Sequence, residues 1–216
     1  MSLRACDAPP SLPVVETFHS LQGEGVHSGR SAFFIRLAGC KVGCTWCDTK
    51  HSWPEASHPR QHLQDLAEQS QAAAAAGAAF VVISGGEPLH HNLDALCQAL
   101  SPSQLPLHLE TSGVDPLSGR FDWITLSPKP HAPPCQELLA ACHELKVVVH
   151  DATDLHFAEA MARSAISGRP GGSPAPVLLL QPGWQSEQGQ ALALRHVQAD
   201  PRWRLSLQSH KLLGVR

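Results

Sequence analysis

The sequence predicts an α/β fold arranged as an incomplete (βα)6-type barrel. Segments of strand type and segments of helical type alternate along the chain, which implies parallel strands joined by right-handed crossovers. Each expected strand ends in a polar or glycine-rich cluster. A complete eight-unit barrel typically needs about 250 residues, and about six units fit here. The chain has 216 residues. An open doubly wound sheet is the second choice of fold.

The first elements surround a polar loop. Residues 1–13 are rich in Pro and Ser, and we expect them to lack regular structure. Residues 14–18 form a short expected strand, and the polar segment 20–25 follows it. Its two glycines permit a tight turn or a close approach to a ligand. A lone G-x-G is weak evidence, and a plain turn explains it equally well.

The remaining elements follow from hydrophobic pattern. Continuous apolar runs rich in β-branched residues predict buried parallel strands, and segments rich in helix-forming residues predict helices. Strands are expected at 32–38, 80–83, 105–109, 123–126, 144–149, 177–180 and 204–207, and helices at 61–79, 92–100, 134–142, 153–164 and 187–197. We expect the polar clusters after the strands to converge on one face, beside a lateral mouth.

Composition indicates one domain, residues 1–216, with its own core. The net charge of -3 gives no indication of a nucleic-acid or membrane surface. No run of about 18 apolar residues and no signal-peptide pattern occurs, so we expect a cytoplasmic protein. Seven cysteines then favour reduced thiols and metal binding over disulfides.

Three of those cysteines stand at the spacing C-x3-C-x2-C. Cys40, Cys44 and Cys47 follow an expected strand, where α/β folds place their chemistry. Three thiolates suit an iron–sulfur cluster with one iron left open. Structural zinc is the alternative, with His51 as fourth ligand, and a thioredoxin-like pair needs only two cysteines. A further interpretation is a loop whose thiols bind no metal.

The other cysteines have no motif spacing. We interpret each of them as a small buried apolar residue or as a surface thiol without a function; they are Cys6, Cys97, Cys135 and Cys142. The fourteen histidines are scattered, and we expect most of them on the surface or in loops.

The cysteine motif, with the aromatic Trp46 before its last cysteine, resembles the signature of the radical S-adenosylmethionine (SAM) superfamily. There the amino and carboxylate groups of SAM bind the open iron. The segment 84–88, Ser-Gly-Gly-Glu-Pro, resembles the superfamily's glycine-rich segment that receives the aminoacyl end of SAM. The expected fold is therefore a barrel of the radical SAM kind.

A closer resemblance is to the 7-carboxy-7-deazaguanine synthase family of the queuosine and deazapurine pathway. The matching segments are 21–25, 34–40, 46–49, 84–88, 127–129 and 208–211, spread over nearly the whole chain. The resemblance implies a lyase that converts 6-carboxy-5,6,7,8-tetrahydropterin to 7-carboxy-7-deazaguanine with loss of ammonia. It also implies a [4Fe-4S] cluster, SAM, magnesium, a homodimer and an electron donor such as a flavodoxin or ferredoxin.

The resemblance also assigns residues to these groups. The implied SAM contacts are Trp46, Cys47, Asp48, Gly86, Glu87, Ser127, Pro128, Lys129, Gln181, Pro182, Gly183 and Trp184, and the implied substrate contacts are Leu21, Gln22, Gly23, Glu24, Arg36, Ser84 and Arg216. Cys40, Cys44 and Cys47 are the implied cluster ligands, with Thr49 on magnesium. No protein acid or base is assigned.

Chemical reasoning supports three of these roles and leaves an alternative for two of them. A carboxylate such as Glu24 can accept both hydrogens of the pterin's amine and ring N–H. Arg36 offers a fork of donors for the substrate carboxylate, or is a surface arginine. Thr49 offers an oxygen to Mg²⁺, or caps a helix. A radical SAM activase acting on a partner protein is the alternative function.

Overall fold

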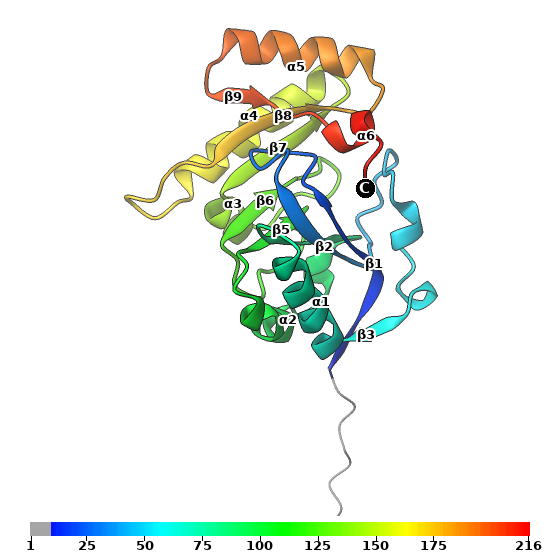
Figure 1. Cartoon of the computed structure of the whole chain (residues 1–216). Coiled ribbons are helices and arrows are strands. Elements are labelled where there is room, and N and C mark those ends of the chain that lie inside the picture. Colours follow the sequence, from blue (N-terminus) through cyan, green and yellow to red (C-terminus); the bar gives the residue numbers. More distant parts are fainter. Residues whose placement is uncertain (1–9) are drawn as a thin grey trace, which may run out of the picture.

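A computed structural model describes residues 10–216. Nine strands form one mixed sheet in the order β3-β1-β2-β4-β5-β6-β7-β8-β9 (Figure 1). The strands are β1 (Ser11–Leu21), β2 (Ser31–Leu37), β3 (Arg60–His62), β4 (Val81–Gly85), β5 (Leu107–Thr111), β6 (Trp123–Leu126), β7 (Glu144–Val149), β8 (Val177–Pro182) and β9 (Trp203–Leu205). From β2 to β9 every pair is parallel, whereas β1 is antiparallel to both β2 and β3.

Six α-helices connect or follow these strands. They are α1 (Leu63–Ala75), α2 (Asp94–Leu100), α3 (Gln136–Ala141), α4 (Ala152–Ser167), α5 (Glu187–Ala199) and α6 (Ser209–Leu213). Helix α4 begins with a capping box built from Asp151 and Asp154, which satisfies amides of its first turn. Of the described helices, none is both long and apolar enough to cross a bilayer.

The first five helices pack on one face of the sheet. Side chains of α1 to α5 share a single buried cluster with alternate residues of the strands, among them Ile35, Ile83, Leu109 and Val147. Because strand side chains alternate between faces, the intervening residues point the other way. Those residues include Arg36, Glu110 and Lys146, and they line a cavity. The sheet therefore has one apolar face under helices and one largely polar face.

The structure corrects the prediction for the N-terminal region. Residues 11–13 are not irregular, because they pair with residues 60–62 of β3 as the beginning of β1. A strand at 60–62 was not predicted, since the expected helix began at residue 61. The preceding residues 1–9, with Cys6, lie outside the described part of the chain. The other free cysteines include Cys97 and Cys142, which are buried as expected, and Cys135, which is half-buried.

Candidate active site

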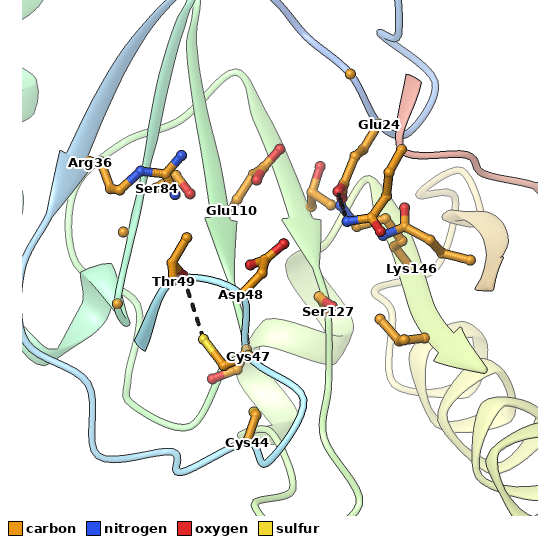
Figure 2. Close-up of a pocket in the computed structure, with 18 of the residues that line it drawn as sticks. Glu24, Arg36, Cys44, Cys47, Asp48, Thr49, Ser84, Glu110, Ser127 and Lys146 are labelled. Atoms are coloured by element: carbon orange, nitrogen blue, oxygen red, sulfur yellow. Dashed lines mark hydrogen bonds and ion pairs between the residues drawn. The ribbon is translucent and has the colours of Figure 1, made fainter. Parts of the chain in front are cut away.

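The polar face of the sheet holds a cavity of about 480 Å³ (Figure 2), within the size range of small-molecule sites. Almost every residue implied by the resemblance lines it. These are Leu21, Gln22, Gly23, Glu24, Arg36, Cys40, Cys44, Trp46, Cys47, Asp48, Thr49, Ser84, Gly86, Glu87, Ser127, Lys129, Gln181, Gly183, Trp184 and Arg216. Pro128 and Pro182 are not among the lining residues.

The lining residues come from two ends of the sheet, so the expected convergence on one face is only partly correct. The cysteine loop, residues 39–49, follows the carboxyl end of β2, and Lys129 follows the carboxyl end of β6. The loop after β1 arrives from the opposite end, because β1 runs antiparallel to β2. Its Val26 amide donates to Oε2 of Glu144, the first residue of β7, at 3.0 Å. The cavity therefore has the cysteine loop at one end and residues 22–24 at the other.

The three thiols are not gathered as closely as the ligands of a closed zinc site. Within residues 10–216, the only His, Cys, Asp or Glu trio with ligand atoms all within 4.8 Å of one another is Glu159, His196 and Asp200. Zinc bonds of about 2.3 Å in a tetrahedron place sulfurs only about 3.8 Å apart. At least two of the three cysteine sulfurs therefore lie more than 4.8 Å apart, a spacing compatible with ligands to separate irons of a cubane. His51, the alternative zinc ligand, does not line the cavity.

The glycine-rich segment packs tightly against the cysteine loop. A Cβ atom on Gly86 would lie 2.4 Å from the Gly39 carbonyl oxygen and 2.9 Å from Cys40 Cβ, so only glycine fits. Burial raises the pKa of the Cys40 and Cys44 thiols. Burial also lowers the pKa of Lys129, whose Nζ donates to the Ser127 carbonyl and hydroxyl oxygens, each at 2.7 Å.

Glu87 is buried, and groups of the chain itself saturate its carboxylate. Oε1 accepts hydrogen bonds from the Thr111 hydroxyl at 2.5 Å and the Leu89 amide at 3.2 Å. Oε2 accepts from the amide and the hydroxyl of Ser112, at 2.8 and 2.5 Å. The carboxylate thus ties the turn after β4 to the end of β5, and little of its accepting capacity is left for a ligand ammonium.

Arg36 points from β2 into the cavity beside Ser84 and Thr49 (Figure 2). Its Nε donates to Glu16 Oε1 at 3.0 Å. The other oxygen of that carboxylate pairs with the guanidinium of Arg216, also at 3.0 Å. Within the described chain, no group accepts a hydrogen bond from the two terminal nitrogens of Arg36. They are placed to hold an anionic group.

Thr49 does not cap the short helix that follows it. It occupies the position before the 3-10 turn Lys50–Ser52, but its side chain makes no capping hydrogen bond. Its Oγ1 lies 3.5 Å from Cys47 Sγ and faces the cavity (Figure 2). The helix-cap alternative is therefore not realised, and the hydroxyl oxygen is directed at the site.

Glu24 forms a buried ion pair with Lys146 at this end of the cavity (Figure 2). Its other oxygen, Oε1, accepts from Gln208 Nε2 at 2.8 Å. Burial raises the pKa of Glu24, but the charge and hydrogen bond of Lys146 outweigh it and hold the pKa well below the usual range. Each carboxylate oxygen of Glu24 thus already accepts a hydrogen bond from the protein. The expected role of Glu24 in binding the amine and ring N–H of the pterin would need these oxygens free.

Sequence reasoning missed two charged residues of the cavity, Glu110 and Lys146. Gln22 Nε2 donates to Oε1 of Glu110 at 2.8 Å, and no group of the described chain donates to Oε2. Glu110 is therefore the carboxylate with free accepting capacity. The expected strand ended at residue 109, before Glu110, whereas β5 extends to Thr111, and within it His108 and Glu110 alternate with Leu107 and Leu109.

Helix α6 borders the mouth of the cavity. Lys211 Nζ pairs with Asp48 Oδ2 at 2.5 Å and lies 5.1 Å from the centre of the Trp184 ring. The amide and the hydroxyl of Ser209 donate to the Gly23 carbonyl, at 2.9 and 3.0 Å. The chain end thereby joins the cysteine loop to the loop after β1.

Residues 21–106 match the family described as a 4Fe-4S single cluster domain. Among curated proteins, the 7-carboxy-7-deazaguanine synthase of Prochlorococcus marinus is 53% identical, covering 94% of this chain and 98% of that protein. The protein of the same name from Synechocystis is 49% identical, covering 95% and 94%. The crystal structure of QueE from Escherichia coli superposes with a TM-score of 0.78 at 30% identity, covering 93% and 95%.

The cysteine loop and the cluster-domain match define an iron–sulfur enzyme of the radical SAM class. Nearly full-length identity of up to 53% in these comparisons then shows the particular family. The chain belongs to the 7-carboxy-7-deazaguanine synthase family. A radical activase that acts on a partner protein is not favoured.

Proposed function

We propose that this protein converts 6-carboxy-5,6,7,8-tetrahydropterin to 7-carboxy-7-deazaguanine and ammonia, as a lyase of queuosine biosynthesis. The observation that carries the proposal is the single cavity that places the three cysteines, Arg36 and Glu110 around one space. The names of the full-length relatives support the same reaction. Cys40, Cys44 and Cys47 would hold a [4Fe-4S] cluster, which together with SAM would supply the radical chemistry needed to remove a hydrogen from C6 of the pterin.

In this proposal the chain holds SAM along the carboxyl ends of the strands. The contacts are Trp46, Cys47, Asp48, Gly86, Ser127, Lys129, Gln181, Gly183 and Trp184, all of which line the cavity. Glu87 acts by holding the turn that carries Gly86, because its carboxylate is saturated within the chain. Pro128 and Pro182 act indirectly, because each restricts the backbone between two of these SAM contacts.

The substrate lies between Arg36 and the loop after β1. Arg36 and Arg216 attract its carboxylate, with Ser84 beside them. Leu21, Gln22 and Gly23 offer backbone or side-chain groups to the pyrimidinone edge. Glu110 replaces Glu24 as the carboxylate for the exocyclic amine and ring N–H, because its Oε2 is free. Glu24 then orients the loop through Lys146 and Gln208.

Magnesium is placed at Thr49. Mg²⁺ takes oxygen ligands and keeps several from water or substrate, and Thr49 Oγ1 faces the cavity without serving as a cap. An ion there would fix substrate oxygens close to the cysteine loop.

The remaining assignments follow from the same family. The one-sided helical layer supports a partial barrel, since a doubly wound sheet carries helices on both faces. We also propose that the protein is a single domain and acts as a cytoplasmic homodimer. A flavodoxin or ferredoxin supplies electrons to the cluster.

The proposal is tested by anaerobic reconstitution with iron and sulfide, followed by incubation with SAM, a reductant and the carboxypterin. The expected result is brown protein and 7-carboxy-7-deazaguanine, identified by mass spectrometry. A Cys44→Ala variant treated identically is the control and should form no product. Colourless protein with stoichiometric zinc, or brown protein that leaves the carboxypterin intact, would refute the proposal.

A further inference from the structure

The middle of the cysteine loop lies between two glycines in left-handed conformations. Gly39 has φ 101° and Gly43 has φ 76°, a region where glycine carries no steric penalty. A Cβ atom on Gly43 would meet nothing closer than 4.0 Å, so surrounding atoms do not confine this residue. Within the described chain, no backbone–backbone hydrogen bond engages residues 41–43. Something else must hold this segment between the ligands Cys40 and Cys44.

A histidine from the next loop holds the first residue of that segment. The Lys41 amide donates to Nε2 of His90 at 3.0 Å. Because Nε2 accepts, the ring proton resides on Nδ1, which pairs with Oδ2 of Asp115. His90 ends the short helical turn Pro88–His90, and Asp115 follows β5. Asp115 thereby selects the tautomer that can receive the amide of the cysteine loop.

A second histidine holds the next residue from the other side. Nε2 of His131 donates to the Val42 carbonyl oxygen at 3.1 Å. His131 lies in the turn after β6, between the bridged residues Lys129 and Ala132. Its ring also meets Trp46 edge-on, with ring centroids 5.7 Å apart. Two separate loops of the scaffold therefore grip the cysteine loop between its glycines.

We infer that His90, oriented by Asp115, and His131 are positioning residues that hold the cysteine loop in the conformation that binds the iron–sulfur cluster. The inference rests on the proposed function and adds three residues that the family resemblance did not assign.

The test compares the rate of cluster loss in reconstituted protein. Wild type and the variants His90→Leu, Asp115→Ala and His131→Leu are loaded anaerobically, and excess ferrous chelator is added. Bleaching of the visible absorption band gives the rate. Each variant should bleach about fivefold to tenfold faster, the effect of losing one hydrogen bond. His196→Leu is the matched control, since it removes a similar histidine–carboxylate pair, with Glu159, far from the loop.

Conservative variants separate positioning from general damage. Asp115→Asn keeps an oxygen that accepts from Nδ1, and His131→Gln keeps a donor for Val42, so both should bleach at nearly the wild-type rate. Melting of the iron-free proteins should show that the leucine and alanine variants remain folded. If wild type takes up no iron, the proposed function fails. If wild type is brown but His90→Leu, Asp115→Ala and His131→Leu bleach at the wild-type rate, or if His196→Leu bleaches as fast as His90→Leu, the inference fails.

Discussion

Arg36 connects the cavity to the proposed substrate through two nitrogens that no described group engages. Arg36→Ala should lower kcat/KM for the carboxypterin about 10- to 100-fold, the cost of a lost charge-assisted contact. Most of the loss should appear in KM, while SAM cleavage without substrate persists. Steady-state kinetics measure KM and the rate of SAM cleavage. The control is Arg60→Ala, which removes an exposed ion pair with Glu55. Unchanged kcat/KM in Arg36→Ala would remove the substrate role of this residue.

Thr49 should link magnesium to the reaction. Thr49→Val keeps the shape of the side chain and removes its oxygen. Cluster assembly and uncoupled SAM cleavage should persist, while product formation falls and responds less to added Mg²⁺. A positional error of about 1 Å can cost about 100-fold in rate. Product assays over a magnesium series give the answer, with Thr49→Ser as the variant that retains the oxygen. Wild-type turnover and Mg²⁺ response in Thr49→Val would place the metal elsewhere.

At the residue scale, motif spacing singled out the cysteines and the glycine-rich segment, and both line the cavity. It could not predict how carboxylates are shared among partners. Glu24 and Glu87 stand in the expected segments, yet tertiary contacts occupy their oxygens. Glu110 acquires its free oxygen only because Gln22, distant in sequence, binds the other one.

The loop after β1 is anchored by the buried pair of Glu24 and Lys146. Lys146→Met should destabilise the fold by about 3–5 kcal/mol near pH 7, since it leaves a buried carboxylate unpaired. Lys146 holds the Glu24 pKa low, so its loss should matter less toward pH 5, where the unpaired carboxyl takes up a proton. Chemical denaturation at both pH values measures the difference.

The double variant Glu24→Gln/Lys146→Met should recover part of that stability. Arg60→Met, which breaks an exposed pair, is the control and should cost no more than about 1 kcal/mol. Equal stability of Lys146→Met and Arg60→Met would show that the buried pair does not anchor the loop.

At the element scale, the sequence predicted strands best where burial alone defines them. The strands 123–126 and 144–149 have the predicted bounds. Strand β1 extends beyond its predicted ends because pairing with β2 and β3 stabilises flanking residues that lack strand propensity. Helix α6 was not predicted, since its five residues depend on contacts such as Ser209 with Gly23.

Across the whole molecule, acid should weaken the fold through a buried histidine at the amino ends of the strands. His108 stacks on Phe80, with centroids 4.2 Å apart, and burial lowers its pKa from 6.5 to about 3. Between these two pH values, His108 therefore binds a proton in the unfolded chain and not in the folded chain. Its contribution to stability is complete above pH 6.5 and is lost as the pH falls toward 3, by up to about 1.4 kcal/mol per pH unit.

His108→Phe should flatten this acid dependence while keeping the stacked ring. Denaturation midpoints between pH 7 and pH 4 measure it, and His62→Phe at an exposed position controls for the added ring. His27 and His143 have lowered pKa values from burial too, so some acid dependence should remain. A His108→Phe profile parallel to wild type would contradict the assignment.

At this scale, alternation of strands and helices predicted a mixed α/β architecture with a functional face. It did not reveal that β1 is antiparallel, because a strand's direction depends on its partner and not on its own pattern. That reversal brings residues 22–24 to the end of the cavity opposite the cysteine loop.

The central claim is that this cavity performs radical chemistry on a carboxypterin. The most direct measurement uses carboxypterin deuterated at C6, with reconstituted protein, SAM, reductant and Mg²⁺ under anaerobic conditions. Mass spectra should show deuterium in the 5′-deoxyadenosine, together with 7-carboxy-7-deazaguanine. Unlabelled 5′-deoxyadenosine with no deazaguanine product would contradict the claim.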